Sequence, residues 1–312
     1  MSRFNYVLIR LLQIVPTFLC IMVVIFVLVR LLPGDPTSAI LGDKATDEAV
    51  QRINAELGLD RSIFYQFVVF LERVASGDLG SSIVLKVPVR QLIQQRLPVT
   101  LMLTLYAALL AVLVAVPIAF LAALKRNRPT DNAIRAIFQV GLSMPVFYVG
   151  LILLSTLAAN FRWFPVGGYG ETALQHLYHL FLPALTLAFS FAAILMRNLR
   201  AAIIEVLHAE YVDFARSKGL RQSVVMGQHV LRNALVSSIT LFGLHIGSLV
   251  GGAVVTETVF AIPGAGRLMV DSIFGRDYPV VQGLTMTLAV MVSLVFLATD
   301  LLQAWLDPRV GK

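Results

Sequence analysis

EYVDFARSKGL, residues 210–220, and HVLRNAL, residues 229–235, form a charged segment between two long apolar runs. The run at residues 180–199 precedes this segment, and the run at 235–256 follows it. Because a charged side chain at the centre of a bilayer costs about 2.5–3.5 kcal/mol on insertion scales, the segment belongs in water. We predict that it contacts another protein there.

The rest of the chain has the composition of a membrane protein. Of its 312 residues, 58% are hydrophobic and 14% are charged, whereas soluble domains are about 45–50% apolar. A helix needs about 20 apolar residues to cross the hydrocarbon core. Six runs of that kind predict six transmembrane helices, near residues 9–30, 100–124, 136–160, 180–199, 235–256 and 280–302. The single cysteine, Cys20, leaves no disulfide or cysteine-based metal site.

Basic residues predict the orientation in the membrane. They gather before the first run, between the second and third, and between the fourth and fifth. By the positive-inside rule, these segments and both termini face the cytoplasm. The residues are Arg3, Arg10, Lys125, Arg126, Arg128, Arg135, Arg197, Arg200, Arg216, Lys218, Arg221 and Arg232.

The first connection is long enough to be a small external subdomain. We divide the chain into residues 1–32, the N-terminus and first span; 33–98, the external subdomain; and 99–312, the core with a cytoplasmic loop at 201–235. Thr46 can cap a helix that ends at Gly58, and a second helical pattern runs through Phe64 to Leu71. Two roles stay open for this subdomain. It either plugs the outer face of the bundle or binds an external partner or ligand there.

The charged segment reads as two helices with a glycine between them. Tyr211, Phe214 and Ala215 have the spacing of one apolar stripe on a helix. Gly219 stands where a helix ends in a left-handed turn, and Ser223 can cap a second short helix. A lipid-surface anchor is the alternative, but its acidic residues, Glu210 and Asp213, disfavour contact with an anionic leaflet.

This segment resembles the cytoplasmic EAA loop of permease subunits of bacterial ABC importers. In the general pattern, Glu-Ala-Ala is followed after three residues by glycine, and this chain has Asp213-Phe214-Ala215 and then Gly219. The proline of the later Ile-x-Leu-Pro is absent, because Arg232 stands in its place. The version found in dipeptide, oligopeptide and nickel permeases is matched by Tyr211-Val212, Ala215-Arg216, Lys218-Gly219-Leu220 and residues 229–235.

Further matches to that permease family are spread along the chain. Two departures fall at Ser237 and Ser238, where proline is common, and at Phe296, where asparagine is common. The matches are Leu32-Pro33-Gly34-Asp35-Pro36, Leu57-Gly58-Leu59-Asp60, Gly77-Asp78-Leu79-Gly80, Arg96-Leu97-Pro98, Pro145-Val146-Phe147, Leu182-Pro183-Ala184, Glu257-Thr258-Val259-Phe260 with Pro263-Gly264, Arg276-Asp277-Tyr278-Pro279, and Asp307-Pro308-Arg309.

The resemblance implies a fold and a set of partners. It implies an all-helical type I ABC importer permease in the bacterial inner membrane, with a coupling helix between the fourth and fifth spans. It also implies a second, related permease, two ATP-binding subunits that carry ATP and Mg²⁺, and an external solute-binding protein. No phosphate-binding Gly-x-x-x-x-Gly-Lys motif occurs in the chain, so we expect no catalytic site, cofactor or metal in it, and we expect no nucleic-acid partner. The coupling residues are Glu210, Tyr211, Asp213, Phe214, Ala215, Lys218, Gly219, His229, Arg232 and Asn233.

Three glycines on the fifth run predict a site of close helix packing. Gly243, Gly247 and Gly251 recur every four residues and so share one helix face. The sequence leaves open whether that face meets another helix of this chain or the second permease.

Rival functions lack their characteristic residues. A secondary transporter would show inverted repeats and ionisable groups within its spans, and neither is evident in the sequence. The cargo is open: peptides are the default for the family that the chain resembles, with nickel chelates, glutathione, opines or sugars as alternatives.

Overall fold

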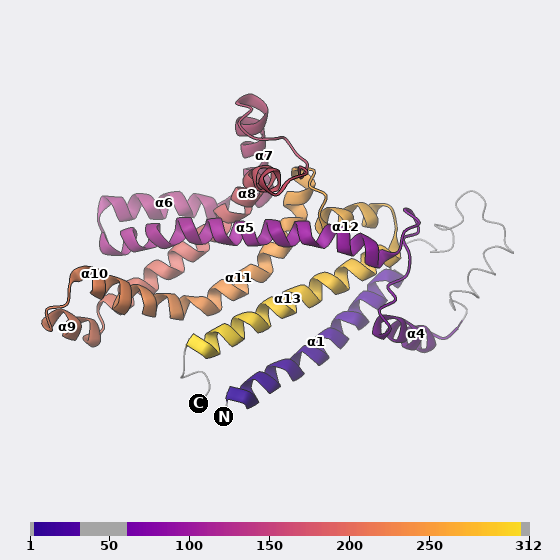
Figure 1. Ribbon diagram of the computed structural model, residues 1–312, viewed down its shortest axis with the longest axis horizontal. Coiled ribbons are helices and arrows are strands. Elements are labelled where there is room, and N and C mark those ends of the chain that lie inside the picture. Colours follow the sequence, from indigo (N-terminus) through magenta and orange to yellow (C-terminus); the bar gives the residue numbers. More distant parts are fainter. Residues whose placement is uncertain (1–2, 32–60, 307–312) are drawn as a thin grey trace.

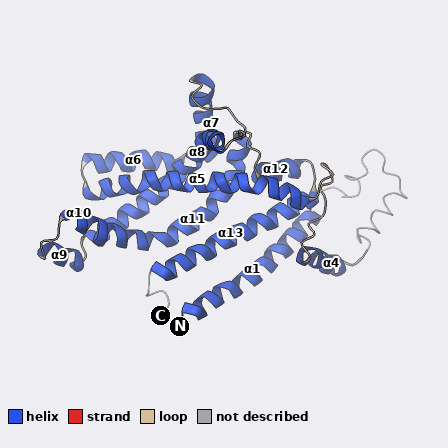
Figure 2. Ribbon diagram, in the orientation of Figure 1, coloured by secondary structure: helices blue, strands red, loops and turns tan. Residues whose placement is uncertain are grey.

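The computed structural model describes residues 3–31 and 61–306, and this part of the chain is a bundle of helices (Figures 1 and 2). The helices are α1 (Arg3–Leu31), α4 (Ile63–Ala75), α5 (Val89–Leu124), α6 (Pro129–Ser143), α7 (Val146–Leu153), η2 (Leu154–Asn160), α8 (Ala173–Leu207), α9 (Glu210–Ser217), α10 (Gln222–Val224), η3 (Val225–Leu231), α11 (Arg232–Val259), α12 (Ala265–Phe274) and α13 (Tyr278–Leu306).

The structure confirms an all-helical membrane protein. Among the described residues, α5, α8 and α13 are long and apolar enough to cross a membrane, and a fourth span arises if α6 and the helix after it count as one bent span. α1 contributes a shorter apolar stretch, Val15–Val27. The count of six spans stays a prediction.

The third predicted span, residues 136–160, is not one straight helix. It bends by 103° between α6 and the helical segment that begins with α7. Met144 takes an extended conformation with φ −83° and ψ 130°, and Pro145 follows it. Proline disfavours the helical conformation in the residue before it and has no N–H to donate, which accounts for the break.

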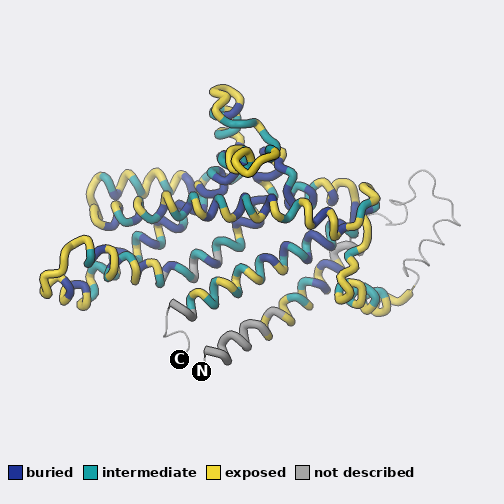
Figure 3. The backbone as a smooth tube through the Cα atoms, in the orientation of Figure 1, coloured by how far each residue is buried: buried dark blue, intermediate teal, exposed yellow. Residues whose placement is uncertain are grey.

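The core of the bundle lies where α5 packs against α8. Four alanines of α5 at intervals of four, Ala107, Ala111, Ala115 and Ala119, are fully buried. Small side chains on one face let two helix axes approach closely, and α8 fills this face with large side chains that include Leu180 and Leu199. Figure 3 shows the buried band along these helices.

At one end of the bundle, α4 packs against α1. The rings of Phe67 and Phe70 lie 5.0 and 5.7 Å from the ring of Phe26. This helix confirms the helical pattern that the sequence predicted from Phe64 to Leu71. The helix predicted from Thr46 to Gly58 lies outside the described residues.

The charged segment lies at the opposite end from α4 and α12. Figure 1 shows α9 and α10 at one end of the long axis and the other two helices at the other end. α1 and α13 run antiparallel, so the start of α1 and the end of α13 both point toward the side of α9.

Candidate functional site

α9 is a short helix that ends at a glycine, as the sequence predicted. The N–H of Lys218 donates to the carbonyl of Phe214 at 3.1 Å, and the N–H of Gly219 donates to that of Arg216 at 2.9 Å. Gly219 has φ +74°, in the left-handed region that side chains disfavour. The chain therefore turns sharply after two helical turns.

The buried face of α9 differs from the predicted stripe. Val212 is fully buried and Ala215 is 4% exposed, and both belong to the same core cluster as Val225 and Val230 of η3. Of the predicted stripe, Ala215 is buried in this core, whereas Tyr211 and Phe214 are exposed. Tyr211 borders the face that the core covers, and the packing of η3 decides which face that is.

The outer face of α9 combines aromatic and charged side chains. Tyr211 is 44% exposed and Phe214 is 62% exposed. The ammonium of Lys218 lies 4.5 Å from the centre of the Phe214 ring, and Arg216 pairs with Asp213 at 3.2 Å. Glu210 is exposed at the first turn. Two large rings thus project from a helix whose other face is fixed in the core.

The segment after Gly219 is one continuous helical stretch rather than a separate short helix. α10 begins at Gln222, with Arg221 at its N-cap, and leads through η3 into α11. The predicted cap at Ser223 was therefore wrong, because the extended residue that starts the helix is Arg221, with ψ 138°. α9 is joined by a short turn to a helix that runs to Val259.

The remaining predicted coupling residues lie on this stretch. The carbonyl of His229 accepts a hydrogen bond from Nδ2 of Asn233 at 2.7 Å. Arg232 and Asn233 are exposed on the first turn of α11, and His229 is half-buried on η3.

The three glycines of α11 do not share one environment. A Cβ atom on Gly243 would lie 1.9 Å from Cγ2 of Thr299, and one on Gly247 would lie 2.8 Å from the ring of Phe296. Both contacts are with α13 of the same chain. Gly251 is exposed, and no atom lies within 4 Å of its ideal Cβ position.

Sequence reasoning missed a buried polar cluster at the end of α11. Glu257 is fully buried, and its carboxylate accepts from the Thr100 hydroxyl at 2.6 Å and from the Arg267 N–H at 2.9 Å. The Thr100 hydroxyl in turn accepts from the N–H of Ala265 at 2.8 Å. One carboxylate thus holds α5, α11 and the start of α12 together. Its signal was present, because Glu257 opens one of the motifs shared with the permease family.

A second missed pair lies at the end nearer α9. Asp131 of α6 is fully buried and accepts from Nε and NH2 of Arg200 of α8, at 2.7 and 2.6 Å. The N–H of Asn127 donates to the same carboxylate at 2.9 Å. This pairing fixes the start of α6 to α8.

A third missed carboxylate joins the segment before α5 to the turn before α13. Asp277 is 2% exposed and accepts from the Ser82 hydroxyl and from the N–H groups of Ile83 and Val84, the latter two at 3.1 and 3.3 Å. The motif containing Asp277 was recognised as a family match, but the sequence could not name its partners, which lie more than 190 positions away.

No metal-binding cluster is found within residues 3–31 and 61–306. No group of three His, Cys, Asp or Glu side chains there could hold an ion.

Comparison with known proteins identifies the family. Residues 115–312 match the family described as "Binding-protein-dependent transport system inner membrane component", and residues 1–104 match "Binding-prot-dependent transport system membrane comp, N-term". The chain is 39% identical over 306 residues to the glutathione transport system permease protein GsiC of Pectobacterium atrosepticum, with 98% of each chain covered. It is also 39% identical over 312 residues to the oligopeptide transport system permease protein AppB of Bacillus subtilis, again with 98% of each covered.

Solved structures agree on the fold. An inward-facing structure of the MetNI methionine ABC transporter aligns with a TM-score of 0.60 and 16% identity, covering 70% of this chain and 97% of that one. At this identity the likeness shows the fold alone. The chain belongs to the binding-protein-dependent transport system inner membrane components, and it is the multi-pass permease subunit of an ABC importer of the peptide-transport type.

Proposed function

We propose that this chain forms half of a heterodimeric translocation pathway for di- or oligopeptides and that α9 is its coupling helix. One observation carries the proposal: α9 presents the exposed rings of Tyr211 and Phe214 while Val212 and Ala215 anchor it in the core. In this proposal the rings enter a groove on a separate ATPase subunit. ATP and Mg²⁺ bind to two such subunits and not to this chain.

The shape of α9 suits the transmission of force. Moving a transporter from 1:99 to 99:1 between two conformations takes about 5.5 kcal/mol of differential stabilisation. A flexible loop would absorb that work as local motion. α9 is anchored on its inner face and continues through the turn at Gly219 into the long helix that ends at Val259, so a displacement of α9 moves α11 with it.

The proposed topology follows from the position of α9. In this arrangement the end of the bundle with α9 and both termini faces the cytoplasm, and the end with α4 and α12 faces outward. The external solute-binding protein then delivers cargo to the outer end, where residues 33–98 form the external subdomain. This orientation agrees with the basic connection at residues 125–128.

Gly251 is the part of the glycine face that we assign to the second permease. Side chains of α13 of the same chain fill the space beside Gly243 and Gly247, whereas the space beside Gly251 is open. A glycine on an exposed helix face permits close approach of a second helix.

Peptides are the proposed cargo. The relatives named for oligopeptide and glutathione transport cover nearly the whole chain, and glutathione is itself a small peptide. Nickel chelates, opines and sugars are the alternatives. Uptake of labelled dipeptide, in competition with unlabelled oligopeptide, glutathione and nickel chelate, separates them. Identification of the ligand retained by the solute-binding protein that co-purifies with the transporter is a second test.

The coupling proposal is tested with Phe214→Ala in the assembled transporter. We expect loss of peptide uptake and weaker retention of the ATPase subunits, because truncating a buried aromatic anchor at an interface costs about 2 kcal/mol or more, roughly 30-fold in affinity. Phe274→Ala is the matched control for ATPase retention, since Phe274 is 84% exposed on α12, a helix at the opposite end of the bundle from α9. Normal uptake and normal ATPase retention in Phe214→Ala would refute the assignment of α9.

A further inference from the structure

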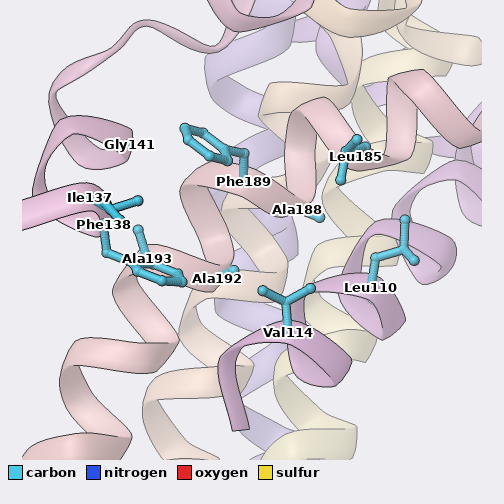
Figure 4. Close-up of a pocket in the computed structure, with 10 residues that line it drawn as sticks. All are labelled: Leu110, Val114, Ile137, Phe138, Gly141, Leu185, Ala188, Phe189, Ala192 and Ala193. Atoms are coloured by element: carbon cyan, nitrogen blue, oxygen red, sulfur yellow. The ribbon is translucent and has the colours of Figure 1, made fainter. Parts of the chain in front are cut away.

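Two adjoining cavities lie on the side of α6 and α8. The first, about 90 Å³, is apolar and lies where α5, α6 and α8 meet, with Val114, Gly141 and Phe189 among its lining residues. Figure 4 shows side chains from these three helices around it. The second, about 440 Å³, lies between α6 and α8. Phe138 and Ala193 line both, so the cavities share a wall.

The second cavity is basic. Arg135, Arg197 and Arg200 all line it. One carboxylate, Asp131, lies beside them; it takes two hydrogen bonds from Arg200 and lies 3.7 Å from Nε of Arg135. Three guanidinium groups against one carboxylate leave an excess of positive charge.

Arg197 is the arginine of this cavity whose charge is not paired with a carboxylate of the described residues. Its side chain is exposed, and no acceptor for it is found in the described part of the chain. By contrast, Arg135 is steered by a hydrogen bond to Oδ1 of Asn132 at 2.6 Å. The cavity thus presents donors that are held in place and not fully used.

The surroundings of the cavities are those of a membrane surface. Ile137 and Val140 of α6 are 62% and 53% exposed, so this helix offers apolar side chains outward beside the apolar cavity. Lys125, Arg126 and Arg128 form the turn just before α6 and add positive charge at the start of that helix. An occupant must therefore be apolar along α6 and anionic at its start.

We propose that the two cavities together bind an anionic phospholipid, with the phosphate at Arg135 and Arg197 and one acyl chain along Phe138 into the apolar cavity. Basic pockets between membrane helices are suited to anionic headgroups, because each cation near them contributes about 1 kcal/mol. A zwitterionic lipid of the same chain length gains less, since its ammonium group meets the same guanidinium groups. The bound lipid would brace α6 against α8 next to the bend at Pro145.

The test uses the assembled transporter purified in detergent and delipidated. Binding of phosphatidylglycerol and of phosphatidylcholine with identical acyl chains is titrated by native mass spectrometry. We expect wild type to prefer phosphatidylglycerol and Arg197→Gln to bind it about fivefold more weakly, the equivalent of about 1 kcal/mol. Phosphatidylcholine binding should fall by a smaller factor, so that the preference between the two lipids narrows. Val114→Phe, which fills the apolar cavity, is expected to weaken both lipids. Arg90→Gln, the same change at an exposed position near the other end of α5, is the matched control and is expected to bind as wild type does.

Four results would overturn the proposal. Equal binding of the two lipids by wild type would remove the headgroup preference, and unchanged phosphatidylglycerol binding in Arg197→Gln would remove the site. Displacement of the lipid by millimolar inorganic phosphate would show a site for a free anion. Binding to the isolated chain but not to the assembled transporter would show that the second permease covers this face.

Discussion

The carboxylate of Glu257 accepts a hydrogen bond from the hydroxyl of Thr100 at 2.6 Å, although the two residues lie 157 positions apart. The same hydroxyl accepts from the N–H of Ala265. Because both residues are buried, loss of the hydroxyl leaves a carboxylate with one donor fewer and an N–H with no acceptor from Thr100.

Thr100→Val is therefore expected to destabilise the protein by about 1–3 kcal/mol, the cost of leaving buried polar groups unsatisfied. Thr104→Val is the control, since the Thr104 hydroxyl donates only to a carbonyl of its own helix, that of Thr100, at 2.7 Å. Thermal unfolding in detergent measures both. Equal melting temperatures for the two variants would contradict the role given to the Glu257 cluster.

Asp131→Asn is expected to cost about 3 kcal/mol, because it leaves the guanidinium of Arg200, only 15% exposed, without its carboxylate. The double variant Asp131→Asn with Arg200→Gln should recover part of this loss. Asp213→Asn serves as the matched control: Asp213 is 67% exposed in its pair with Arg216, and such surface pairs contribute about 0–1 kcal/mol. A double-mutant cycle of melting temperatures that shows no coupling between Asp131 and Arg200 would count against this assignment.

Substitutions at Gly219 are expected to rank by their tolerance of a positive φ. Gly219 has φ +74° and no atom within 4 Å of its ideal Cβ position, so the cost is conformational and not steric. Gly219→Asn should retain most uptake. Gly219→Ala should destabilise the turn after α9 by about 1–2 kcal/mol. Gly219→Val should abolish transport while the protein remains in the membrane. Gly227→Val is the control, because Gly227 also has open space around it but is not among the positive-φ residues. If Asn proved as damaging as Val, backbone conformation would not be the cause.

Gly243→Ala and Gly251→Ala are expected to have different effects on the stability of the isolated chain. The first places a methyl group within 1.9 Å of Thr299 and should destabilise by about 1–3 kcal/mol, with partial rescue by Thr299→Gly. The second has open space and should be neutral or slightly stabilising, by up to about 1 kcal/mol. In the assembled transporter, Gly251→Ala should reduce recovery of the second permease; undisturbed assembly would argue against the interface proposed for Gly251.

Asp277→Ala is expected to release the segment at residues 81–88 from the turn before α13. Asp277 accepts from three donors in residues 82–84, and a buried carboxylate with several donors holds a loop firmly. Limited proteolysis with trypsin should then cut at Lys86 faster than in wild type. Asp78→Ala is the control, since its carboxylate bonds only to the nearby N–H of Gly80 among the described residues; faster cutting in that variant alone would contradict the prediction.

The sequence alone determined the class of the protein and the kind of segment that α9 is. Apolar runs of membrane length predicted an all-helical membrane protein, because backbone polar groups in lipid must be satisfied within the helix. Gly219 marked the end of α9 because its requirement for a positive φ is local and is visible in one residue. The order of short motifs then identified the permease family.

Only the tertiary structure decided which faces are buried and which distant residues meet. The sequence allows an apolar stripe on α9 to include any of residues 211, 212, 214 and 215. Packing against η3 buries Val212 and Ala215. The bend at Pro145 was not predicted, because a proline in an apolar run does not by itself show whether the helix breaks. Pro16, Pro98 and Pro117 lie inside helices that continue through them. The buried carboxylates of Asp131, Glu257 and Asp277 each accept from at least one donor that lies 69 to 195 positions away. Such pairings depend on how the helices assemble, and neither hydrophobic periodicity nor local conformational preference specifies them.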